Sequence, residues 1–599
     1  MSIDIELEEQ FARTSLKRST LKRVLKFMLP YKAPIILSLV MELLYVGAEI
    51  LPPHLIKMGI DKYLPDGNFN MIFILALIYL LSILTLWSIA YIQIKLVVKA
   101  GFSFLTDLRK ALFHKLQELS LSYFDKTKEG RIISRIDRDV ENLEEPLIWG
   151  PFSIVNSFFS ILLVSYIMVN YSLKLSLATL AVLPPLLVAT EIFRRKGLEA
   201  FRKVKEGLSI ITAEYAESIN GVRVIQAYAM EKQRIARFQG VNDLYIKQVL
   251  DVSRLQNTYL PITTALYGAA IAIILFYGAY LVSIKEIGIG VLTAFILYLG
   301  QFFGPIRWLS SLYSELLSAS AALERIFLLL DTSPDIKDRE GVTELPRIKG
   351  DVSFENVYFN YDREQEEPWT LADFNLLVRS GEQIAIVGPT GAGKTTIINL
   401  LSHFYEPQKG SIKIDGFNLQ DISLSSLRKQ LGIVLQDNFL FSGTVMDNLK
   451  YSRPDVADEE VIKAAKALGS HDIISGLSDG YNTKVSGRGE GLSLGEKQLI
   501  CFTRIFLANP RILILDEATS AVDTITERIV QEAFNKLIAG RTSFIIAHRL
   551  STIRNADRII VIEKDDAGNG YLLEEGTHEE LIRTDSKYAS LYKDYIRAN

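Results

Sequence analysis

The sequence predicts a six-helix α-helical membrane domain fused to an α/β domain that carries a phosphate-binding loop. Three observations predict this fold class. Six apolar stretches, each near the roughly 20 residues that cross a bilayer, lie before about residue 325. After them, short apolar runs alternate with helical patterns, which indicates an α/β core with a mainly parallel sheet. The segment IAIVGPTGAGKTT at 384–396 has the strand, glycine-rich loop and helix order of a P-loop.

Composition agrees with a chain of which one half lies in a membrane. Hydrophobic residues make up 49% of its 599 residues, and the mean hydropathy is +0.20. Several domains are expected at this length. The net charge of −3 gives no basic field that would attract nucleic acid. The single cysteine, Cys501, excludes an internal disulfide and a multi-cysteine metal site, and we expect it to be a buried small residue.

Changes in composition along the chain predict four segments. We expect an N-terminal tail at 1–19, a transmembrane domain at 20–330, a polar linker at 331–348 and a nucleotide-binding domain at 349–599. The transmembrane domain begins with 20–33, where basic and apolar residues alternate at helical spacing. This pattern indicates an amphipathic helix at the cytoplasmic interface.

The connections between the six apolar stretches alternate between short and long. The two long ones, about 96–147 and 194–257, have helical patterns and hold most of the lysines and arginines of this half. The positive-inside rule therefore places both long connections and both termini in the cytoplasm of a multi-pass protein of the cytoplasmic membrane. The predicted spans are about 34–53, 71–95, 148–170, 173–193, 258–283 and 288–314.

Two carboxylates interrupt the first span. Glu42 and Glu49 are seven residues apart and share one helix face. In one interpretation, Glu49 lies near the outer interface beside two prolines and Glu42 pairs with a neighbouring helix. In the other, they form a site for a cationic substrate or a proton, because charges at bilayer depth are functional hypotheses by default. Kinks are expected at Pro184–Pro185, Pro261 and Pro305.

The P-loop predicts a site for a nucleoside triphosphate. Its glycines lack Cβ, so backbone N–H groups can close around phosphate oxygens, and the following helix adds its positive N-terminal end. Lys394 would reach the β- and γ-phosphates, and the hydroxyl of Thr395 would hold Mg²⁺. The predicted nucleotide contacts in this loop are Gly388, Pro389, Thr390, Gly391, Ala392, Gly393, Lys394, Thr395 and Thr396.

Further along, polar residues follow the ends of three apolar strands. Asp516 comes directly after the strand 512–515, where an acid can orient Mg²⁺, and Glu517 next to it could position or activate the water that attacks the γ-phosphate. His548 and Gln436 follow two further strands, and we expect both at the same sheet edge as Asp516.

Together these features resemble the ATP-binding cassette exporters, in particular the multidrug and lipid half-transporter group, over nearly the whole chain. The resemblance implies that Tyr361 stacks on adenine, that Asp516 and Glu517 form Walker B and the catalytic glutamate, and that Ser520 to Asp523 form the D-loop. By the same resemblance, Ser493 to Glu496 lie in the signature. The implied catalytic residues are Glu517, His548 and Gln436; the further nucleotide contacts are Ser493, Gly495 and Asp523; the metal ligands are Thr395, Gln436 and Asp516.

Two short stretches in the long connections interrupt the helical periodicity. Residues 120–130 and 216–228 each predict a turn and a short helix, for which an ordinary surface hairpin is the simplest interpretation. They look like the coupling helices of the exporter family, which dock on the nucleotide-binding domains.

The signature departs from the family pattern. Exporters usually have Leu-Ser-Gly-Gly-Gln, where this chain has leucine at 494 and glutamate at 496. In the family, the signature of one chain caps ATP held by the Walker A loop of the other, which corresponds to Gly388 to Thr395 here. Leu494 adds bulk and Glu496 adds negative charge where a phosphate must approach. The resemblance therefore implies a heterodimer in which this chain contributes the hydrolysing Walker B. A normally working homodimer is the alternative, because Ser493 and Gly495 remain.

The expected function is ATP-driven export of a hydrophobic or amphipathic substrate, a drug or a lipid, by alternating access. ATP and Mg²⁺ are the expected cofactors. A second half-transporter chain and the lipid bilayer are the expected partners, and no nucleic acid is expected. The alternatives are a homodimeric lipid flippase, a peptide exporter, and a nucleotide-gated regulator or channel on the same scaffold.

Overall fold

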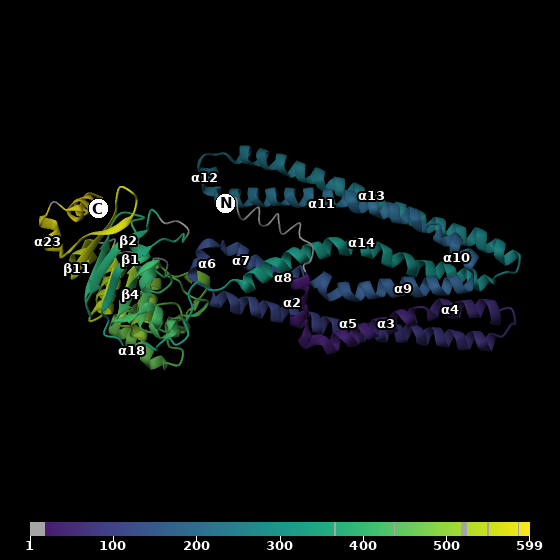
Figure 1. The fold of residues 1–599 in the computed structure, drawn as a ribbon, viewed down its shortest axis with the longest axis horizontal. Helices are drawn as coiled ribbons and strands as arrows, with labels where there is room; N and C mark the ends of the chain where they lie inside the picture. The colour runs from purple at the N-terminus through teal and green to yellow at the C-terminus, as the bar shows by residue number, and fades with distance from the viewer. Residues whose placement is uncertain are drawn as a thin grey trace. The chain divides into compact units, whose positions relative to one another are not determined.

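The chain forms two compact units, both drawn in Figure 1. The first consists of Met1–Glu118 and Lys128–Thr332, and the second of Leu119–Thr127 and Ser333–Asn599. A short segment from the first half of the sequence therefore belongs to the C-terminal unit. The computed structural model describes residues 18–363, 367–435, 438–516, 524–547, 550–584 and 586–598.

The first unit consists of long helices, as predicted. Its helices are α2 (Arg18–Met28), α3 (Lys32–Glu49), α4 (Leu51–Met58), α5 (Phe69–Glu118), α7 (Glu129–Ile136), α8 (Arg138–Glu141), α9 (Gly150–Tyr171), α10 (Leu173–Leu180), α11 (Leu183–Asn220), α12 (Val222–Ala227), α13 (Glu231–Ser283) and α14 (Ile289–Asp331). Among the described residues, five helical stretches are long and apolar enough to cross a membrane, and each contains one predicted span. The sixth predicted span falls on α14, where Ile289–Gly304 is a shorter apolar helix.

Large apolar side chains cover the outside of this unit. Phe276 is 86% exposed and Trp87 is 67% exposed, whereas Tyr298 is fully buried between helices. Such a surface is unfavourable in water but suits lipid, in which helices are held together by close packing and interhelical hydrogen bonds.

The first span is broken between α3 and α4, where two prolines follow. In a continuous helix, the backbone N–H of residue 53 would donate to the carbonyl of Glu49. Pro53 has no N–H, so this hydrogen bond cannot form. That carbonyl instead accepts a hydrogen bond from Gln301 Nε2 of α14 at 3.0 Å. The hydroxyl of Tyr298 donates to the next carbonyl, that of Ile50, at 2.8 Å. The break is thus stabilised by side chains of a neighbouring helix, as a bilayer requires. A second break, between α10 and α11, lies just before Pro184–Pro185.

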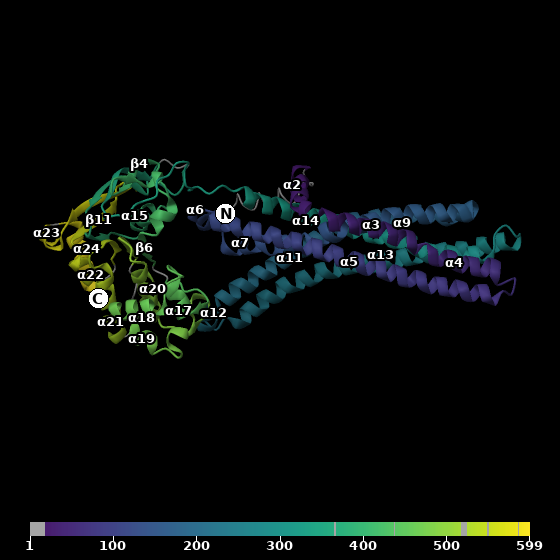
Figure 2. The same ribbon diagram turned by 90° about the horizontal axis from the view of Figure 1, so that it is seen from below.

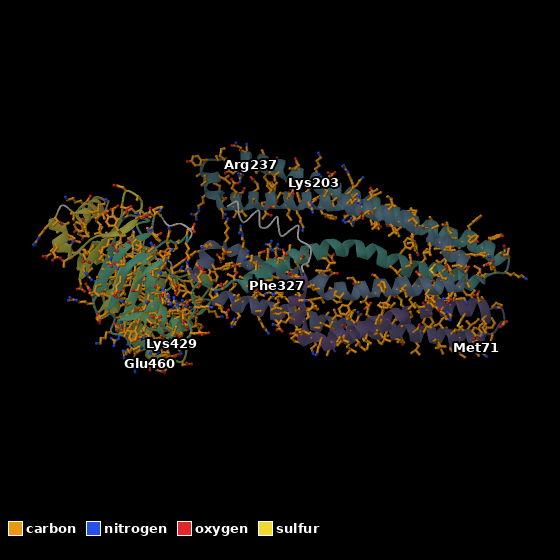
Figure 3. The ribbon with its side chains drawn as sticks, in the orientation of Figure 1. Met71, Lys203, Arg237, Phe327, Lys429 and Glu460 are labelled. Atoms are coloured by element: carbon orange, nitrogen blue, oxygen red, sulfur yellow. The ribbon has the colours of Figure 1, made fainter. Side chains whose placement is uncertain are left out.

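Several helices are much longer than a membrane is thick. The 50 residues of α5 span about 75 Å at 1.5 Å per residue, against about 30 Å of hydrocarbon. The predicted long connections are therefore continuations of the spans. Lys203 on α11 and Arg237 on α13 lie on such continuations, where Figure 3 labels them. Short helices lie in both of the predicted short-helix stretches, α6 (Leu121–Lys126) and α12 (Val222–Ala227).

The second unit contains two main sheets. A six-stranded sheet has the order β12-β11-β3-β10-β9-β6, with every pair parallel except β12–β11. A four-stranded antiparallel sheet has the order β2-β1-β4-β5. The strands are β1 (Val352–Phe359), β2 (Leu371–Val378), β3 (Gln383–Val387), β4 (Lys409–Ile414), β5 (Phe417–Asn418), β6 (Leu431–Val434), β9 (Ile512–Asp516), β10 (Thr542–Ile546), β11 (Arg558–Lys564) and β12 (Gly570–Gly576). The sequence predicted the parallel sheet but neither the separate antiparallel sheet nor β12.

The six-stranded sheet is buried on both faces. Along β3, Ile384 and Ile386 point into one hydrophobic core while Ala385 and Val387 point into another. The first core also takes side chains of the antiparallel sheet, such as Phe354. Because both faces are covered, the strand that leads into the P-loop has a fixed register and position.

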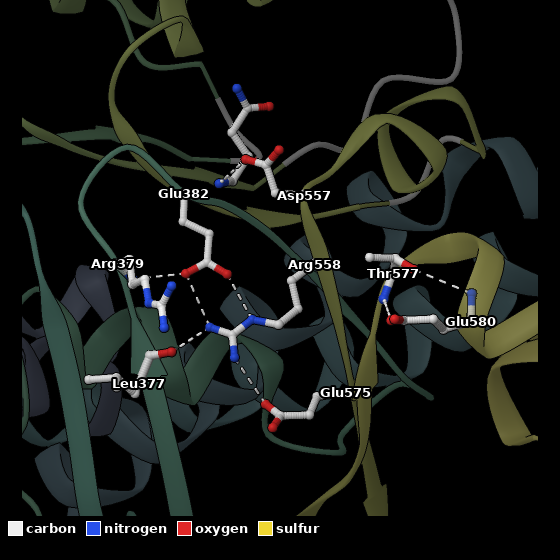
Figure 4. A network of polar contacts seen from close by, with 9 residues as sticks. Leu377, Arg379, Glu382, Asp557, Arg558, Glu575, Thr577 and Glu580 are labelled. Carbon is white, nitrogen blue, oxygen red and sulfur yellow. Dashed lines mark hydrogen bonds and ion pairs between the residues drawn. The ribbon is translucent and has the colours of Figure 1, made fainter.

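A polar cluster ties the start of β11 to its neighbours. The guanidinium of Arg558 contacts Glu382 at 2.8 Å and Glu575 of β12 at 3.3 Å, and it also donates to the carbonyl of Leu377 at the end of β2 (Figure 4). This arginine thus links strands of both sheets.

A layer of helices forms a separate part of the second unit. Helices α17 (Val445–Lys450), α18 (Asp458–Leu468) and α20 (Leu494–Ala508) lie together in Figure 2 and share a core of their own that includes Cys501. Cys501 is buried, as expected.

Candidate functional site

The P-loop has the backbone that its glycines predict. Gly388 has a φ of 154°, and a Cβ there would lie 2.2 Å from the carbonyl oxygen of Ile562. Gly393 has a φ of 109°, and a Cβ there would lie 2.9 Å from the carbonyl of Thr370. Both positions therefore exclude a side chain. Helix α15 (Lys394–Leu401) starts directly after Gly393, so its free N–H groups face the loop.

Lys394 is folded back onto its own loop. Its Nζ donates to the carbonyls of Gly388 at 2.7 Å and Pro389 at 2.8 Å. Burial lowers the pKa of Lys394, and the carboxylate of Asp516 opposes this shift. A half-buried ammonium whose hydrogen bonds go to two backbone carbonyls is a favourable site for an anion such as a phosphate oxygen.

The two threonines after Lys394 differ in exposure. Thr395 is exposed in the first turn of α15, so its hydroxyl is available to a ligand. Thr396 is buried, and its hydroxyl lies 3.3 Å from that of Tyr361. The side chain of Thr396 therefore faces the protein interior.

Asp516 ends β9 at the same sheet edge as the P-loop. It is in register with Ile546 of β10, which is in register with Ile386 of β3. Among the described residues, no group of three His, Cys, Asp or Glu side chains could hold a metal ion. Mg²⁺ needs no such group, because it is typically bound by one or two protein oxygens together with substrate phosphates and water. Thr395 and Asp516 supply donors of this kind.

Four other predicted site residues, Gln436, Glu517, Asp523 and His548, lie outside the described residues. The strands that precede three of them are described. β6 ends two residues before Gln436, β9 ends one residue before Glu517, and β10 ends two residues before His548, all at one edge. The predicted roles of these residues stay predictions.

Tyr361 lies in an aromatic cluster beside the P-loop helix. Its ring makes edge contacts with Phe359 and Tyr405, with centroids 4.9 Å and 5.0 Å away. Asn399 Nδ2 of α15 donates to its hydroxyl at 3.0 Å. The ring is thereby fixed beside the P-loop helix, where a nucleotide base could stack on it.

The predicted signature residues form the start of α20. Ser493 is the N-cap of this helix, and its Oγ accepts from the N–H of Glu496 at 3.3 Å. The carboxylate of Glu496 in turn accepts from the N–H of Ser493 at 2.7 Å. This capping box places a fixed negative charge at the end of the helix where an anion would bind. Gly495 is buried, and the side chain of Leu494 is 37% exposed.

Helix α6 is bound to the nucleotide-binding unit by polar contacts. Tyr405 donates its hydroxyl to Asp125 at 2.5 Å, and the backbone N–H of Ile336 donates to Ser120 Oγ at 3.0 Å. Ser122 donates to Asp335. Burial, and secondly the Asp125 carboxylate, raise the pKa of Tyr405. The sequence predicted the short helix but not these partners, which lie more than 200 residues away along the chain.

In the membrane unit, Glu42 is paired with two neighbouring helices. Its carboxylate accepts a hydrogen bond from Asn156 of α9 at 2.7 Å and another from Gln93 of α5. Glu42 is only 5% exposed. The interpretation that Glu42 pairs with a neighbouring helix is confirmed, with neutral amides as its partners.

Comparisons with known proteins agree with this arrangement. Residues 35–306 match the family described as ABC transporter transmembrane region, and residues 371–520 match the family described as ABC transporter. An uncharacterised ABC transporter ATP-binding protein of Bacillus subtilis (strain 168), YknV, is 38% identical, and the match covers 95% of this chain and 94% of that protein. An ATP-dependent lipid A-core flippase of Syntrophus aciditrophicus (strain SB) is 34% identical, over 96% of this chain and 94% of that protein.

A solved structure of a bacterial Atm1-family ABC exporter with ATP bound is also similar. Its TM-score is 0.75 and its sequence identity 29%, and the match covers 94% of this chain and 98% of that one. Another relative, YgaD of Bacillus subtilis (strain 168), is 33% identical over 96% of this chain and 98% of that protein, and its name describes a candidate multidrug export ATP-binding/permease protein.

A helical unit with an apolar surface and a P-loop unit, joined in one chain, define a membrane transport ATPase. The chain belongs to the ATP-binding cassette (ABC) transporter family, and within it to the exporters. It is a multi-pass membrane protein and an ATP hydrolase coupled to transport.

Proposed function

We propose that this exporter moves a hydrophobic or amphipathic substrate, a drug or a lipid, across the cytoplasmic membrane by alternating access. The proposal rests on one observation. The same chain contains helices that are long and apolar enough to cross a membrane and a complete P-loop. The printed names of two relatives, a candidate multidrug exporter and a lipid A-core flippase, support this substrate class. The basic residues of the long connections support a cytoplasmic position for the nucleotide-binding unit and both termini.

ATP binding uses the chain's own P-loop and Tyr361. The ammonium of Lys394 exchanges the carbonyls of Gly388 and Pro389 for β- and γ-phosphate oxygens, which form stronger charge-assisted hydrogen bonds. The adenine stacks on Tyr361. Thr395 and Asp516 would hold Mg²⁺, which would supply positive charge to neutralise the β- and γ-phosphates.

The residues that follow strands β6, β9 and β10 carry out and control hydrolysis in this proposal. Glu517 positions or activates the attacking water. His548 would contact the γ-phosphate, Gln436 would act in catalysis and as a metal ligand, and Asp523 would contact the nucleotide. Two nucleotide-binding domains close on ATP because ATP binds the closed dimer better. The short helices α6 and α12 transmit that closure to the spans.

We further propose an asymmetric heterodimer. ABC exporters act as dimers, and each signature faces a nucleotide held by the other chain. The capping box of Ser493 and Glu496 supports a weakened cap, because the Glu496 carboxylate already occupies an N–H that a phosphate would use. In this assembly the ATP at Lys394 is the one hydrolysed, and Leu494 and Glu496 cover an idle site. A homodimeric lipid flippase or peptide exporter is the alternative, followed by a nucleotide-gated regulator or channel.

Purification of the tagged chain from its native membrane tests the assembly. We expect recovery of a second half-transporter that lacks the Walker B glutamate but has an intact Leu-Ser-Gly-Gly-Gln signature. Recovery of this chain alone, with full ATPase activity, would refute the heterodimer.

Transport is tested in inside-out vesicles that contain the purified assembly. We expect MgATP to drive uptake of a fluorescent apolar dye or of a labelled phospholipid, and the Glu517→Gln variant to abolish it. A nucleotide-dependent current without accumulation of either probe would favour the channel instead.

A further inference from the structure

A cavity adjoins Tyr361 within the nucleotide-binding unit. Its volume is about 220 Å³, well above the roughly 10–15 Å³ that one water molecule needs. Side chains of the nucleotide-binding domain and of α6 line it, among them Tyr361, Arg363, Phe404, Tyr405, Ser122 and Lys126. All of these residues belong to the second unit, which includes the α6 segment Leu119–Thr127.

The lining of this cavity suits the base end of a nucleotide. Aromatic rings form part of the wall, and base–aromatic stacking is tolerant of the base and strong. Helix α6 adds the ammonium of Lys126 to the lining as a hydrogen-bond donor, whereas the hydroxyl of Ser122 already donates to Asp335. Bases and ribose offer ring nitrogens and oxygens as acceptors, so the cavity combines aromatic side chains for stacking with an ammonium that can donate to the nucleoside.

The α6 side of the cavity is held in place. Helix α6 is attached through Asp125 to Tyr405, whose ring contacts Tyr361, and through Ser120 to the backbone of Ile336. Leu121 packs against the hydrophobic core of the nucleotide-binding unit. Lys126 is exposed and is therefore free to extend toward a ligand in the cavity.

We propose that the first coupling segment, α6, forms part of the nucleotide site of its own chain. The adenosine end of the ATP held at Lys394 lies between Tyr361 and α6, and Lys126 donates a hydrogen bond to it. Bound nucleotide therefore contacts directly the segment that continues into α5 and α7. This inference rests on the proposed adenine-stacking role of Tyr361.

Equilibrium binding to the full-length transporter in a Glu517→Gln background tests the contact. Loss of one charge-assisted hydrogen bond in Lys126→Ala should raise the dissociation constant for MgATP about fivefold to tenfold. The matched control is Lys128→Ala, an exposed lysine two residues further on, which should stay within about twofold. Inorganic triphosphate lacks the adenosine end, so its own dissociation constant should be the same in both variants.

A third variant separates the two hypotheses. Tyr361→Ala should weaken the binding of MgATP but not the binding of triphosphate. If Tyr361→Ala weakens MgATP and Lys126→Ala does not, the α6 contact is overturned while the adenine role stands. If Tyr361→Ala has no effect, the adenine role and this inference both fail.

Photolabelling with 8-azido-ATP gives a readout that does not depend on affinity. We expect the modified peptides to include the segment 119–127, with excess ATP suppressing the label. Label confined to peptides of the nucleotide-binding domain would overturn the proposal.

Discussion

The charge of Glu496 is the feature of the signature that can be tested most sharply. Its carboxylate lies 2.7 Å from the N–H of Ser493, at the end of α20 that faces a nucleotide in the proposed dimer. Glutamine at this position can keep the same hydrogen bond, because its amide oxygen also accepts from that N–H. The substitution Glu496→Gln therefore removes the charge and leaves the helix cap in place.

The magnitude follows from the geometry of the helix end. A phosphate one helical turn away, at about 5.4 Å, would be repelled by about 3 kcal/mol per unit charge at an effective dielectric constant of 20. Mg²⁺ and salt screen part of this repulsion. We expect a net gain of about 1.4 kcal/mol in Glu496→Gln, which corresponds to tenfold tighter binding of MgATP at the site that this signature covers.

The assay is equilibrium binding of MgATP to the assembled dimer in a Glu517→Gln background. Glu496→Ala is the control for the cap, and we expect it to lower the apparent melting temperature because a helix cap contributes about 1 kcal/mol. An unchanged MgATP affinity in Glu496→Gln, with an unchanged melting temperature, would show that this carboxylate does not face the phosphate.

The other predictions concern the P-loop, hydrolysis, the membrane unit and α6. Lys394→Ala should lower the affinity for MgATP, measured by equilibrium binding, at least tenfold, because charge-assisted hydrogen bonds to phosphate oxygens are lost. An unchanged affinity would contradict the proposed contact of Lys394 with phosphate. Glu517→Gln should lower ATPase activity at least about a hundredfold yet preserve MgATP affinity; near-normal turnover would reject its catalytic role. Glu42→Leu leaves two partly buried amides without this acceptor, so its apparent melting temperature should fall below that of Glu42→Gln, and equal values would argue against the hydrogen bonds. Tyr405→Phe removes a buried hydroxyl from its partner on α6, so hydrogen exchange in 119–127 should quicken; wild-type protection there would exclude an anchoring role.

Local patterns were sufficient to predict the parts of the fold that carry chemistry. The strand before Gly388 and the helix after Gly393 are defined by adjacent residues, and the spans are defined by continuous apolar stretches. Edge strand β12 was missed because GYLLEEG has little alternation and few apolar residues. The antiparallel sheet was missed because its strands have similar local patterns to the parallel ones, and only their pairing distinguishes them.

Contacts between distant residues were beyond local patterns. Glu42 and Asn156 are 114 positions apart, and Asp125 and Tyr405 are 280 apart. The sequence identified Glu42 as unusual because charge is rare at bilayer depth. It gave no sign of Asp125, which is an ordinary polar residue in a polar segment. Only the folded chain shows that its carboxylate anchors α6 to Tyr405.

The connections on either side of α6 are short, so α6 cannot move far from α5 and α7. Two residues separate the end of α5 at Glu118 from the start of α6 at Leu121, and two more separate Lys126 from Glu129 of α7. Three Cα–Cα steps of 3.8 Å limit each gap to about 11 Å. Because α6 is bonded to the nucleotide-binding unit, a displacement of that unit beyond this limit must pull both helices with it. The covalent chain is thus itself a tether between α6 and both helices.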